Sequence, residues 1–431
     1  MNRILVLLVP VLLVSAAPLA EAAPPAGVCA HADPAHSPVV QEPWAQQLLN
    51  PKRVWPSSTG AGVLVAVVDS GVDSDHPQLS APGKVLPGRD FFFAGELPGN
   101  FDCASHGTAV ASIIAADPAS GIGFSGIAPG ARILPVRVTD RSLNDSGEPQ
   151  PIAPDAVAAG LRYAADQGAK VINLSLSGYG DLPPIRDAVA YAQSKDALIV
   201  AAAGNRQERA AGSASFPAGY PGVVGVGSID IAGARDDSSQ TGPYVDLVAP
   251  GKGVVGATRV GGHDYWEGTS FAAPFVAGTA ALVRAAWPSL TAQQVAQRLI
   301  ATADVARGGA GSQGYGAGVV DPYRAVTEGL SGAPKALPAV PPQAVDVAAQ
   351  REHAWWARAG ASAKLVAGAL VLAILLAVLG AAVAVRGSRR RWRAGRSAAK
   401  PRALGREEPP EEMFLFPPPA VERPDPSWRK P

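Results

Sequence analysis

Charged side chains, cysteine and methionine are scarce in this sequence of 431 residues. Only 17% of the residues are charged, against about 25% in ordinary soluble domains. The 37 lysines and arginines almost balance 36 aspartates and glutamates, which argues against a nucleic-acid partner, because nucleic-acid-binding proteins carry a basic excess. With 47% hydrophobic residues, disorder of the whole chain is excluded, since disorder requires low hydrophobicity and high net charge.

Only two long hydrophobic runs occur, and both point to a membrane. Arg3 is followed by the aliphatic run 4–14 and then by small residues up to Ala22. A basic start, an apolar segment and an A-x-A site are typical of a secretory signal peptide. We therefore expect residues 1–22 to be a signal peptide cleaved after Ala22. An uncleaved anchor is the alternative, although the run is short for a bilayer span.

The second run, residues 365–385, contains no charged residue. As a helix it covers about 30 Å, the thickness of the hydrocarbon core of a bilayer. Seven arginines and lysines follow it within fifteen positions, and such residues are retained on the cytoplasmic side. Together with Trp355 and Trp356 before the run, this predicts a single-pass protein of the cell membrane with its body outside and the tail 386–431 inside. A buried core helix is the alternative.

The two cysteines are Cys29 and Cys103, and neither belongs to a Cys-x-x-Cys pair. Zinc and redox sites therefore have little support, and we expect no metal and no other cofactor. In an exported protein, an even number of cysteines favours a disulfide. Such a bond closes a loop of about 75 residues and contributes about 4 kcal/mol in the chain-entropy model. Two free thiols are the alternative.

Short apolar segments alternate with helical patterns through the exported body. Short runs that are wholly or mostly apolar predict strands that are buried on both faces, here at 63–68, 133–138, 171–174, 198–202 and 223–226. Helices are predicted at 106–116, 154–167, 183–194 and 271–287, and from Thr291, with Gln294 completing a capping box. Strands that alternate with helices favour an α/β fold, a mostly parallel sheet with helices on both faces.

Composition divides the body further. Residues 23–61 (the arm) are rich in proline and alanine and predict an extended N-terminal extension with anchoring aromatic residues. Residues 62–330 are long enough to bury one substantial core. Residues 331–364 form a Pro/Ala-rich linker, semi-extended by composition.

Three short segments carry the residue types of nucleophilic catalysis. Asp69 closes a predicted strand in D-S-G, His106 opens a predicted helix in H-G-T, and Ser270 begins the long apolar helix in G-T-S-F-A-A-P. A serine hydroxyl needs a base to take its proton, and a carboxylate orients the imidazole that does so. Because such strand and helix ends converge on one edge of an α/β sheet, we predict that these three residues are catalytic.

The order Asp–His–Ser, with no G-x-S-x-G around Ser270, differs from the orders in other large serine hydrolase classes. The three segments in this order resemble those of the subtilisin-like serine peptidases, peptidase family S8. The resemblance implies a subtilisin-like fold, an acyl-enzyme mechanism and protein substrates. It also implies that Asn205 donates its amide to the oxyanion. The substrate-binding residues that it implies are Ser175, Leu176, Ser177 and Gly178, with Ala203 and Gly204.

A narrower resemblance rests on the flanks. The arm is too short for an independent propeptide domain; with the cysteine pair, the linker and the span, it is similar to that of mycosins, membrane-anchored subtilisin-like peptidases associated with type VII secretion systems. This implies an attached arm that wraps the catalytic domain, a disulfide near His106, processing of secretion substrates and support of the membrane secretion complex. The tail 401–431 is longer and richer in proline and glutamate than in mycosins.

The sequence leaves a second function open. The protein could be mainly a structural subunit that stabilises the secretion channel, with proteolysis dispensable, whereas a tethered enzyme is a poor general nutritional protease.

We expect His76 to lie in a surface turn before Pro77. Asp73 and Asp75 are expected to be loop carboxylates, with calcium binding as a minor alternative.

Overall fold

The computed structural model describes residues 29, 32–93, 97–140, 152–178, 180–207, 213–309, 311–329, 368, 370–371, 373 and 375–386. The chain divides into two units, 1–343 and 344–431. The described part of the second unit includes an apolar helix at Leu375–Arg386, whose side chains are exposed. The predicted signal peptide, the whole linker 331–364, the start of the predicted span (365–367) and the tail beyond residue 386 lie outside the described residues.

A parallel sheet of seven strands forms the centre of the first unit, in the order β2-β3-β1-β4-β5-β6-β7. Every neighbouring pair is parallel. The strands β1, β4, β5, β6 and β7 are buried along their whole length, as continuous apolar runs require. The bounds are β1 Leu64–Asp69, β2 Arg89–Asp90, β3 Arg132–Arg137, β4 Val171–Leu174, β5 Leu198–Ala202, β6 Val223–Ile229 and β7 Leu247–Pro250.

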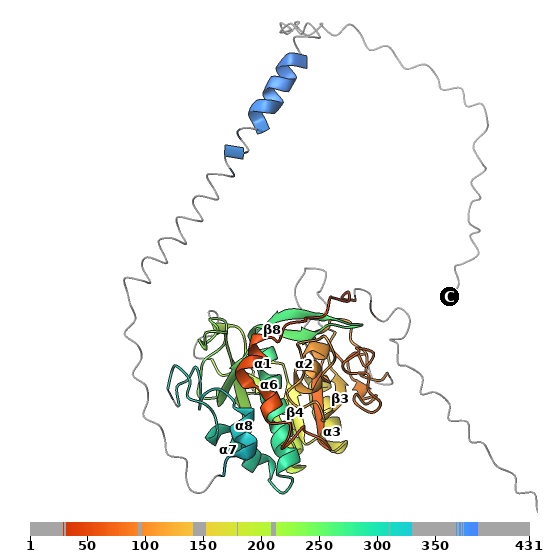
Figure 1. Ribbon diagram of the computed structural model, residues 1–431, viewed down its shortest axis with the longest axis vertical. Coiled ribbons are helices and arrows are strands. Elements are labelled where there is room, and N and C mark those ends of the chain that lie inside the picture. Colours follow the sequence, from red (N-terminus) through yellow and green to blue (C-terminus); the bar gives the residue numbers. More distant parts are fainter. Residues whose placement is uncertain are drawn as a thin grey trace, which may run out of the picture. The chain divides into compact units, whose positions relative to one another are not determined.

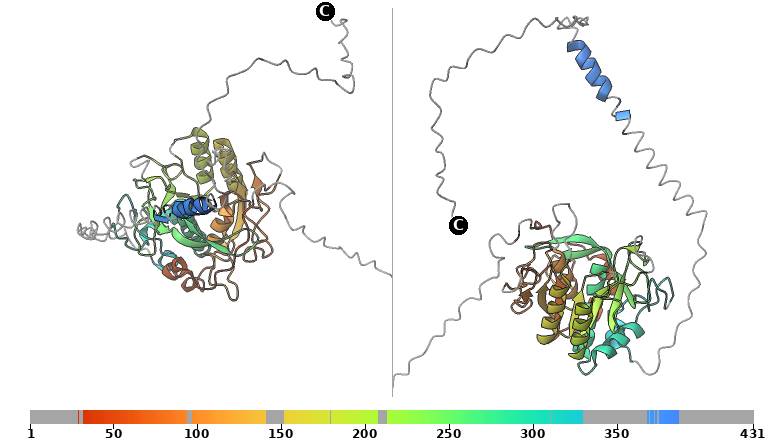
Figure 2. Two further views of the ribbon diagram at one scale, coloured as in Figure 1. Left: turned by 90° about the horizontal axis from the view of Figure 1, so that it is seen from above. Right: turned by 180° about the vertical axis from the view of Figure 1, so that it is seen from behind.

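Helices cover both faces of this sheet (Figures 1 and 2). Side chains alternate along a strand, so Val65 and Val67 of β1 pack with α2 and α6 on one face, while Ala66 and Val68 pack with α3 and α4 on the other. The bounds are α2 His106–Ala115, α3 Pro154–Asp166, α4 Pro183–Ser194 and α6 Thr269–Ala286. The α/β fold with helices on both faces is thus confirmed.

Four further elements flank the long helix α6 in the sequence, two strands before it and two helices after it. An antiparallel hairpin of β8 and β9 lies between β7 and α6, and α7 and α8 close the domain. Thr291 caps α7 in a full capping box with Gln294, as predicted. Among the described residues, α6 alone is long and apolar enough to cross a membrane, and it is buried in the core. The bounds are β8 Lys252–Ala257, β9 His263–Glu267, α7 Ala292–Ala301 and α8 Pro322–Thr327.

The arm differs from the extended segment expected. Its described residues 32–43 contain no helix or strand, but the chain then forms α1 (Trp44–Leu49) and a 3₁₀ turn at Pro51–Arg53. Ala45 and Leu49 of α1 are buried in the main core, because the helix presents them on one face. The indole of Trp44 donates to the carbonyl of Gly253 at 3.0 Å. The arm therefore anchors itself through tertiary packing as well as through aromatic residues.

Candidate active site

Asp69 and His106 meet at the carboxyl end of the sheet. Asp69 is the last residue of β1, and His106 is the first residue of α2. The Nδ1 of His106 donates to Oδ1 of Asp69 at 2.7 Å, and the carboxylate is fully buried. This bond fixes the tautomer in which Nε2 carries the lone pair, as a general base requires.

Ser270 is the second residue of α6, a helix that is buried along nearly all of its length. Its hydroxyl donates to the carbonyl of Ser175 at 3.2 Å, while the Ser175 hydroxyl donates back to the carbonyl of Ser270 at 2.6 Å. The following residue, Phe271, lies with its ring centroid 4.8 Å from that of His106. The fold thus brings Ser270 beside the His106–Asp69 pair, although 164 positions of sequence separate Ser270 from His106.

The side-chain amide of Asn205 has its orientation set by α6. Its Oδ1 accepts from both the backbone N–H and the hydroxyl of Thr269, each at 2.8 Å. Nδ2 therefore points away from Thr269 and toward Gly268, where a Cβ would come within 2.8 Å of it. The Asn205 side chain is thus fixed at the N-terminus of α6, against the two residues that precede Ser270.

Two of the six residues expected to bind substrate, Ser175 and Gly204, contact the first residues of α6. Ser175 and Leu176 are buried directly after β4, while Ser177 and Gly178 are exposed. Gly178 forms an antiparallel bridge with Phe216, so backbone pairing occurs at this edge. Ala203 and Gly204 follow β5 and are buried, and the Gly204 N–H donates to the Thr269 hydroxyl at 3.1 Å. Both segments border the Ser270 turn.

Two aromatic residues beside the histidine were missed by sequence reasoning. The rings of Trp266 and Phe271 are 5.0 Å apart, and both lie in edge or tilted contact with the His106 ring. Trp266 lies in β9, which we did not predict, because its alternation of polar and apolar residues is short. Phe271 was within the quoted G-T-S-F motif, but no sequence signal shows that its ring packs on the imidazole.

A buried carboxylate stabilises the first turn of α2. Asp102 accepts hydrogen bonds from the N–H and the hydroxyl of Thr108 at 2.9 and 2.7 Å, and from the N–H of Ala104 at 3.0 Å. Burial raises the pKa of Asp102 to about 6, and the three hydrogen bonds oppose that rise. An acceptor at a helix N-terminus stabilises unpaired N–H groups. Asp102 therefore fixes the turn that presents His106.

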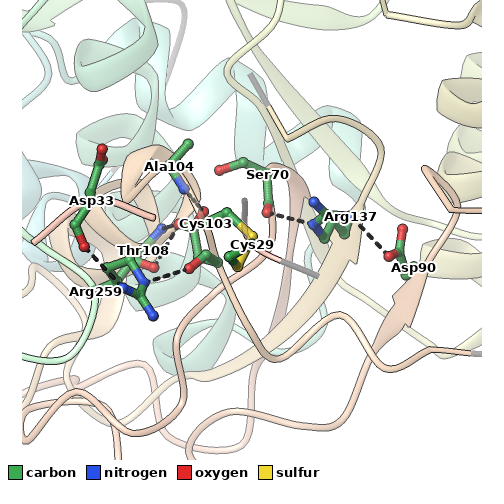
Figure 3. Close-up of a disulfide and its surroundings, with 10 residues drawn as sticks. Cys29, Asp33, Ser70, Asp90, Cys103, Ala104, Thr108, Arg137 and Arg259 are labelled. Carbon is green, nitrogen blue, oxygen red and sulfur yellow. Dashed lines mark hydrogen bonds and ion pairs between the residues drawn. A yellow bond between two sulfur atoms is a disulfide. The ribbon is translucent and has the colours of Figure 1, made fainter. Parts of the chain in front are cut away.

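The predicted disulfide is present and ties the arm to this turn. Cys29 and Cys103 are bonded, with Cα atoms 5.4 Å apart. The N–H of Asp33 donates to the Cys103 carbonyl at 3.0 Å. Arg259 donates to the carbonyls of Asp33 and Asp102 at 2.9 and 3.0 Å, as Figure 3 shows. The start of the arm is thus held three residues from His106.

The expectation for His76 was wrong, because it is buried and not in a surface turn. Only 1% of it is exposed; its Nδ1 accepts from the Gln78 N–H at 3.2 Å and its Nε2 lies 3.1 Å from the Gly262 carbonyl. His263 packs against it at 5.7 Å. The β8-β9 turn and the arm cover this loop, a long-range contact that the local sequence His-Pro does not encode.

The carboxylate of Asp73 fastens the loop after Asp69. Its Oδ1 accepts from the Asp75 N–H at 3.0 Å and its Oδ2 from the Val260 N–H at 2.5 Å. Both oxygens are therefore used within the protein. Among the described residues, no group of three or more His, Cys, Asp or Glu side chains is arranged to hold a metal ion.

Comparison with known proteins agrees with this geometry. Residues 60–318 match the model of the Subtilase family. The chain is 34% identical to Mycosin-3 of Mycobacterium tuberculosis, over 83% of this chain and 86% of that one. It also resembles the crystal structure of MycP1 from Mycobacterium smegmatis, with a TM-score of 0.59 and 30% identity over 74% of this chain and 99% of that one.

Other relatives are longer than the matched region. Fervidolysin of Fervidobacterium pennivorans is 36% identical to this chain over 58% of this chain, and the match spans only 39% of fervidolysin. It spans 64% of a thermophilic serine proteinase from Bacillus sp., with 40% identity over 63% of this chain. From the family match, which includes more than half of its residues, and from its similarity to mycosins, we conclude that the chain belongs to the subtilase family.

Proposed function

We propose that the protein is a serine endopeptidase in which Asp69, His106 and Ser270 form the catalytic triad. The observation that carries the proposal is the 2.7 Å hydrogen bond between His106 Nδ1 and Asp69 Oδ1, beside a serine in the first turn of a buried helix. Membership of the subtilase family supports the same reaction. No cofactor is needed, because the three side chains supply nucleophile, base and orienting carboxylate.

The steps follow from these positions. The Ser270 hydroxyl exchanges its bond to the Ser175 carbonyl for one to His106 Nε2, which takes the proton as Oγ attacks the peptide carbonyl. The Asn205 amide and the N-terminal N–H groups of α6 stabilise the oxyanion. His106 then protonates the departing amine, and water hydrolyses the acyl-enzyme by the reverse proton transfers. Residues 175–178 and 203–204 bind the substrate backbone and its first side chain.

The test of this proposal is Ser270→Ala in the full chain. We expect complete loss of both peptide cleavage and labelling by a fluorophosphonate probe. Ser74→Ala is the matched control, because Ser74 lies at the same end of the sheet but bonds only to Asn100 and should keep full labelling. Persistent labelling of the Ser270→Ala protein would refute the proposed nucleophile.

We further propose that the catalytic domain lies outside the cell, anchored by residues 365–385, and that it processes substrates of a type VII secretion system. The described helix Leu375–Arg386, apolar up to its final arginine, supports the anchor. Similarity to MycP3 protease from the type VII (ESX-3) secretion system, with 34% identity and a TM-score of 0.58 over 68% of this chain and 91% of that one, supports the setting. Reporter fusions at residue 400 and at residue 340 test the topology.

A second function, support of the secretion complex, is favoured by the arm, which a disulfide and a buried helix attach to the domain. If this function dominates, a Ser270→Ala strain still secretes, whereas deletion of residues 365–385 abolishes secretion. An equal defect in the two strains would show that proteolysis is required.

A further inference from the structure

A fully buried ion pair lies beside the catalytic aspartate and has no part in the proposed reaction. Arg137 ends β3 and Asp90 ends β2, and Nη1 of the arginine is 2.9 Å from Oδ2 of the aspartate. Neither side chain is exposed to solvent. Removing such charges from water carries a large free-energy cost, and a buried pair is often no more stabilising than packed apolar residues. Stability alone is thus a weak reason for a buried arginine here.

Strand register places this pair in line with the active site. β3 lies between β2 and β1, and Arg137 is in register with Asp90 on one side and with Asp69 on the other. Adjacent strands are about 4.8 Å apart. Three charged residues therefore stand in one row across the carboxyl end of the sheet, with the guanidinium between two carboxylate-bearing positions.

Ser70 connects the arginine to the catalytic residues. Nε of Arg137 donates to the Ser70 carbonyl at 3.1 Å, as the dashed lines in Figure 3 show. The N–H of Ser70 donates to Asp69 Oδ1 at 2.7 Å, and its hydroxyl accepts from the N–H of Gly107 at 2.9 Å. One residue thus contacts the catalytic carboxylate, the residue after the catalytic histidine, and Arg137.

The turn around Ser70 and the start of α2 are in direct backbone contact. A Cβ on Gly107 would lie 2.0 Å from the carbonyl oxygen of Gly71, so only glycine permits this approach. A shift of the Asp69–Gly71 turn therefore reaches His106 without an intervening flexible side chain.

The surroundings of Arg137 hold its guanidinium in one place. The rings of Phe92, Phe93 and Phe101 lie 5.0, 4.7 and 4.9 Å from its Cζ, at distances where aromatic faces attract a cation. Asp90 is held in turn by the N–H groups of Phe92 and Phe93, which donate to its Oδ1 at 2.7 and 3.2 Å.

We propose that Arg137, held by Asp90, is a positioning residue that acts through Ser70 to align Asp69 with His106. The inference rests on the proposed triad. An arginine suits this position, because Nε and Nη1 are separate nitrogens of one rigid planar fork and each reaches its own acceptor, whereas the three donors of a lysine ammonium all radiate from a single nitrogen. Misalignment of reacting groups lowers the rate of the chemical step more than it weakens substrate binding.

The test measures kcat and KM per active site, titrated with a fluorophosphonate, for full-length Arg137→Lys. We expect kcat to fall at least about tenfold while KM changes less than about twofold. The matched control is Arg284→Lys: Arg284 is also buried and pairs with Asp196 at 3.0 Å, but it lies near the far end of α6 from Ser270. This control should lose stability and keep its kcat.

A double-mutant cycle and a conservative variant identify the route. Ser70→Ala should lower kcat, and Ser70→Thr, which keeps the hydroxyl, should retain it. In the double variant of Ser70→Ala and Arg137→Lys, the loss of kcat should be smaller than the product of the two single losses, because both changes act on the same alignment. If Arg137→Lys does not fold, Asp90→Asn replaces it, with a several-fold loss of kcat expected at constant KM.

Each outcome decides between the two proposals. Unchanged kcat in Arg137→Lys or Asp90→Asn, or an equal loss in Arg284→Lys, overturns the positioning role while leaving the triad intact. Labelling that persists in Ser270→Ala overturns the triad and the positioning role together.

Discussion

Acidification should destabilise the fold through a pair of buried histidines that link the arm to the catalytic domain. His263 accepts the N–H of Val39 on Nδ1 at 3.1 Å, and its Nε2 lies 2.7 Å from Oε1 of Gln78. The bond to Val39 needs a neutral imidazole without a proton on Nδ1, and the bond to Gln78 then places the proton on Nε2. Burial, with a smaller contribution from His76, lowers the pKa of His263 to about 4 from 6.5.

The sign and size follow from proton linkage. The unfolded chain binds a proton near pH 6.5, whereas the folded chain resists it down to about pH 4, so stability falls as the pH drops through this window. The difference corresponds to about 3 kcal/mol for His263, a substantial part of the about 5–15 kcal/mol of a typical domain. Burial also lowers the pKa of His76, and Asp73 opposes that shift, so His76 adds to the loss.

The assay is urea unfolding of the Ser270→Ala protein at pH 7.0, 5.5 and 4.0, with and without His263→Gln. Glutamine keeps one donor and one acceptor but does not titrate, so its free energy of unfolding should fall by about 3 kcal/mol less than that of the parent between pH 7.0 and 4.0. Hydrogen exchange at the Val39 amide should show reduced protection at pH 4 in the parent alone. An identical pH dependence in the two proteins would refute the assigned role of His263.

Three further changes test the site and the arm. Asn205→Ala should lower kcat by about 100- to 1,000-fold with little change in KM, a range measured on subtilisin and not worked out from this structure. Gly268→Ala should also lower kcat, because Gly268 has a φ of +121° and the new Cβ would lie 2.8 Å from Asn205 Nδ2. If the variant keeps its full kcat, the Asn205 amide does not need its present position for catalysis. Replacing Cys29 and Cys103 together by serine should lower the free energy of unfolding by about 4 kcal/mol in the loop-entropy model, measured in urea against the reduced and oxidised parent.

Local signals in the sequence were sufficient for five of the seven strands of the central sheet and for the helices that cover it. Two of the predicted strands and α4 have the predicted bounds, because continuous apolar runs and proline at a helix start depend on neighbouring residues alone. The strands β2 and β7 and the hairpin of β8 and β9 were not predicted. β2 has only two residues, and the alternation in β9 reflects contacts made with the arm and with His106.

The arm shows the limit of composition. Its proline and alanine content predicted an extended chain, yet residues Trp44–Leu49 are helical, since burying Ala45 and Leu49 against the core stabilises a helix that is too short to persist alone. His76 was placed at the surface for the same reason, because its burial comes from Gly262 and His263, almost 190 positions away.

The sequence by itself identified the subtilisin-like family and the triad residues that we propose, because these depend on short motifs, and it favoured a disulfide between its two cysteines. Tertiary structure decided what surrounds those residues. Arg137 lies in a predicted apolar strand, and only the register of three strands puts its guanidinium between Asp90 and the Asp69–Ser70 turn. Sequence patterns record which side chains avoid water, whereas the partners of a buried charge depend on which distant strands become neighbours.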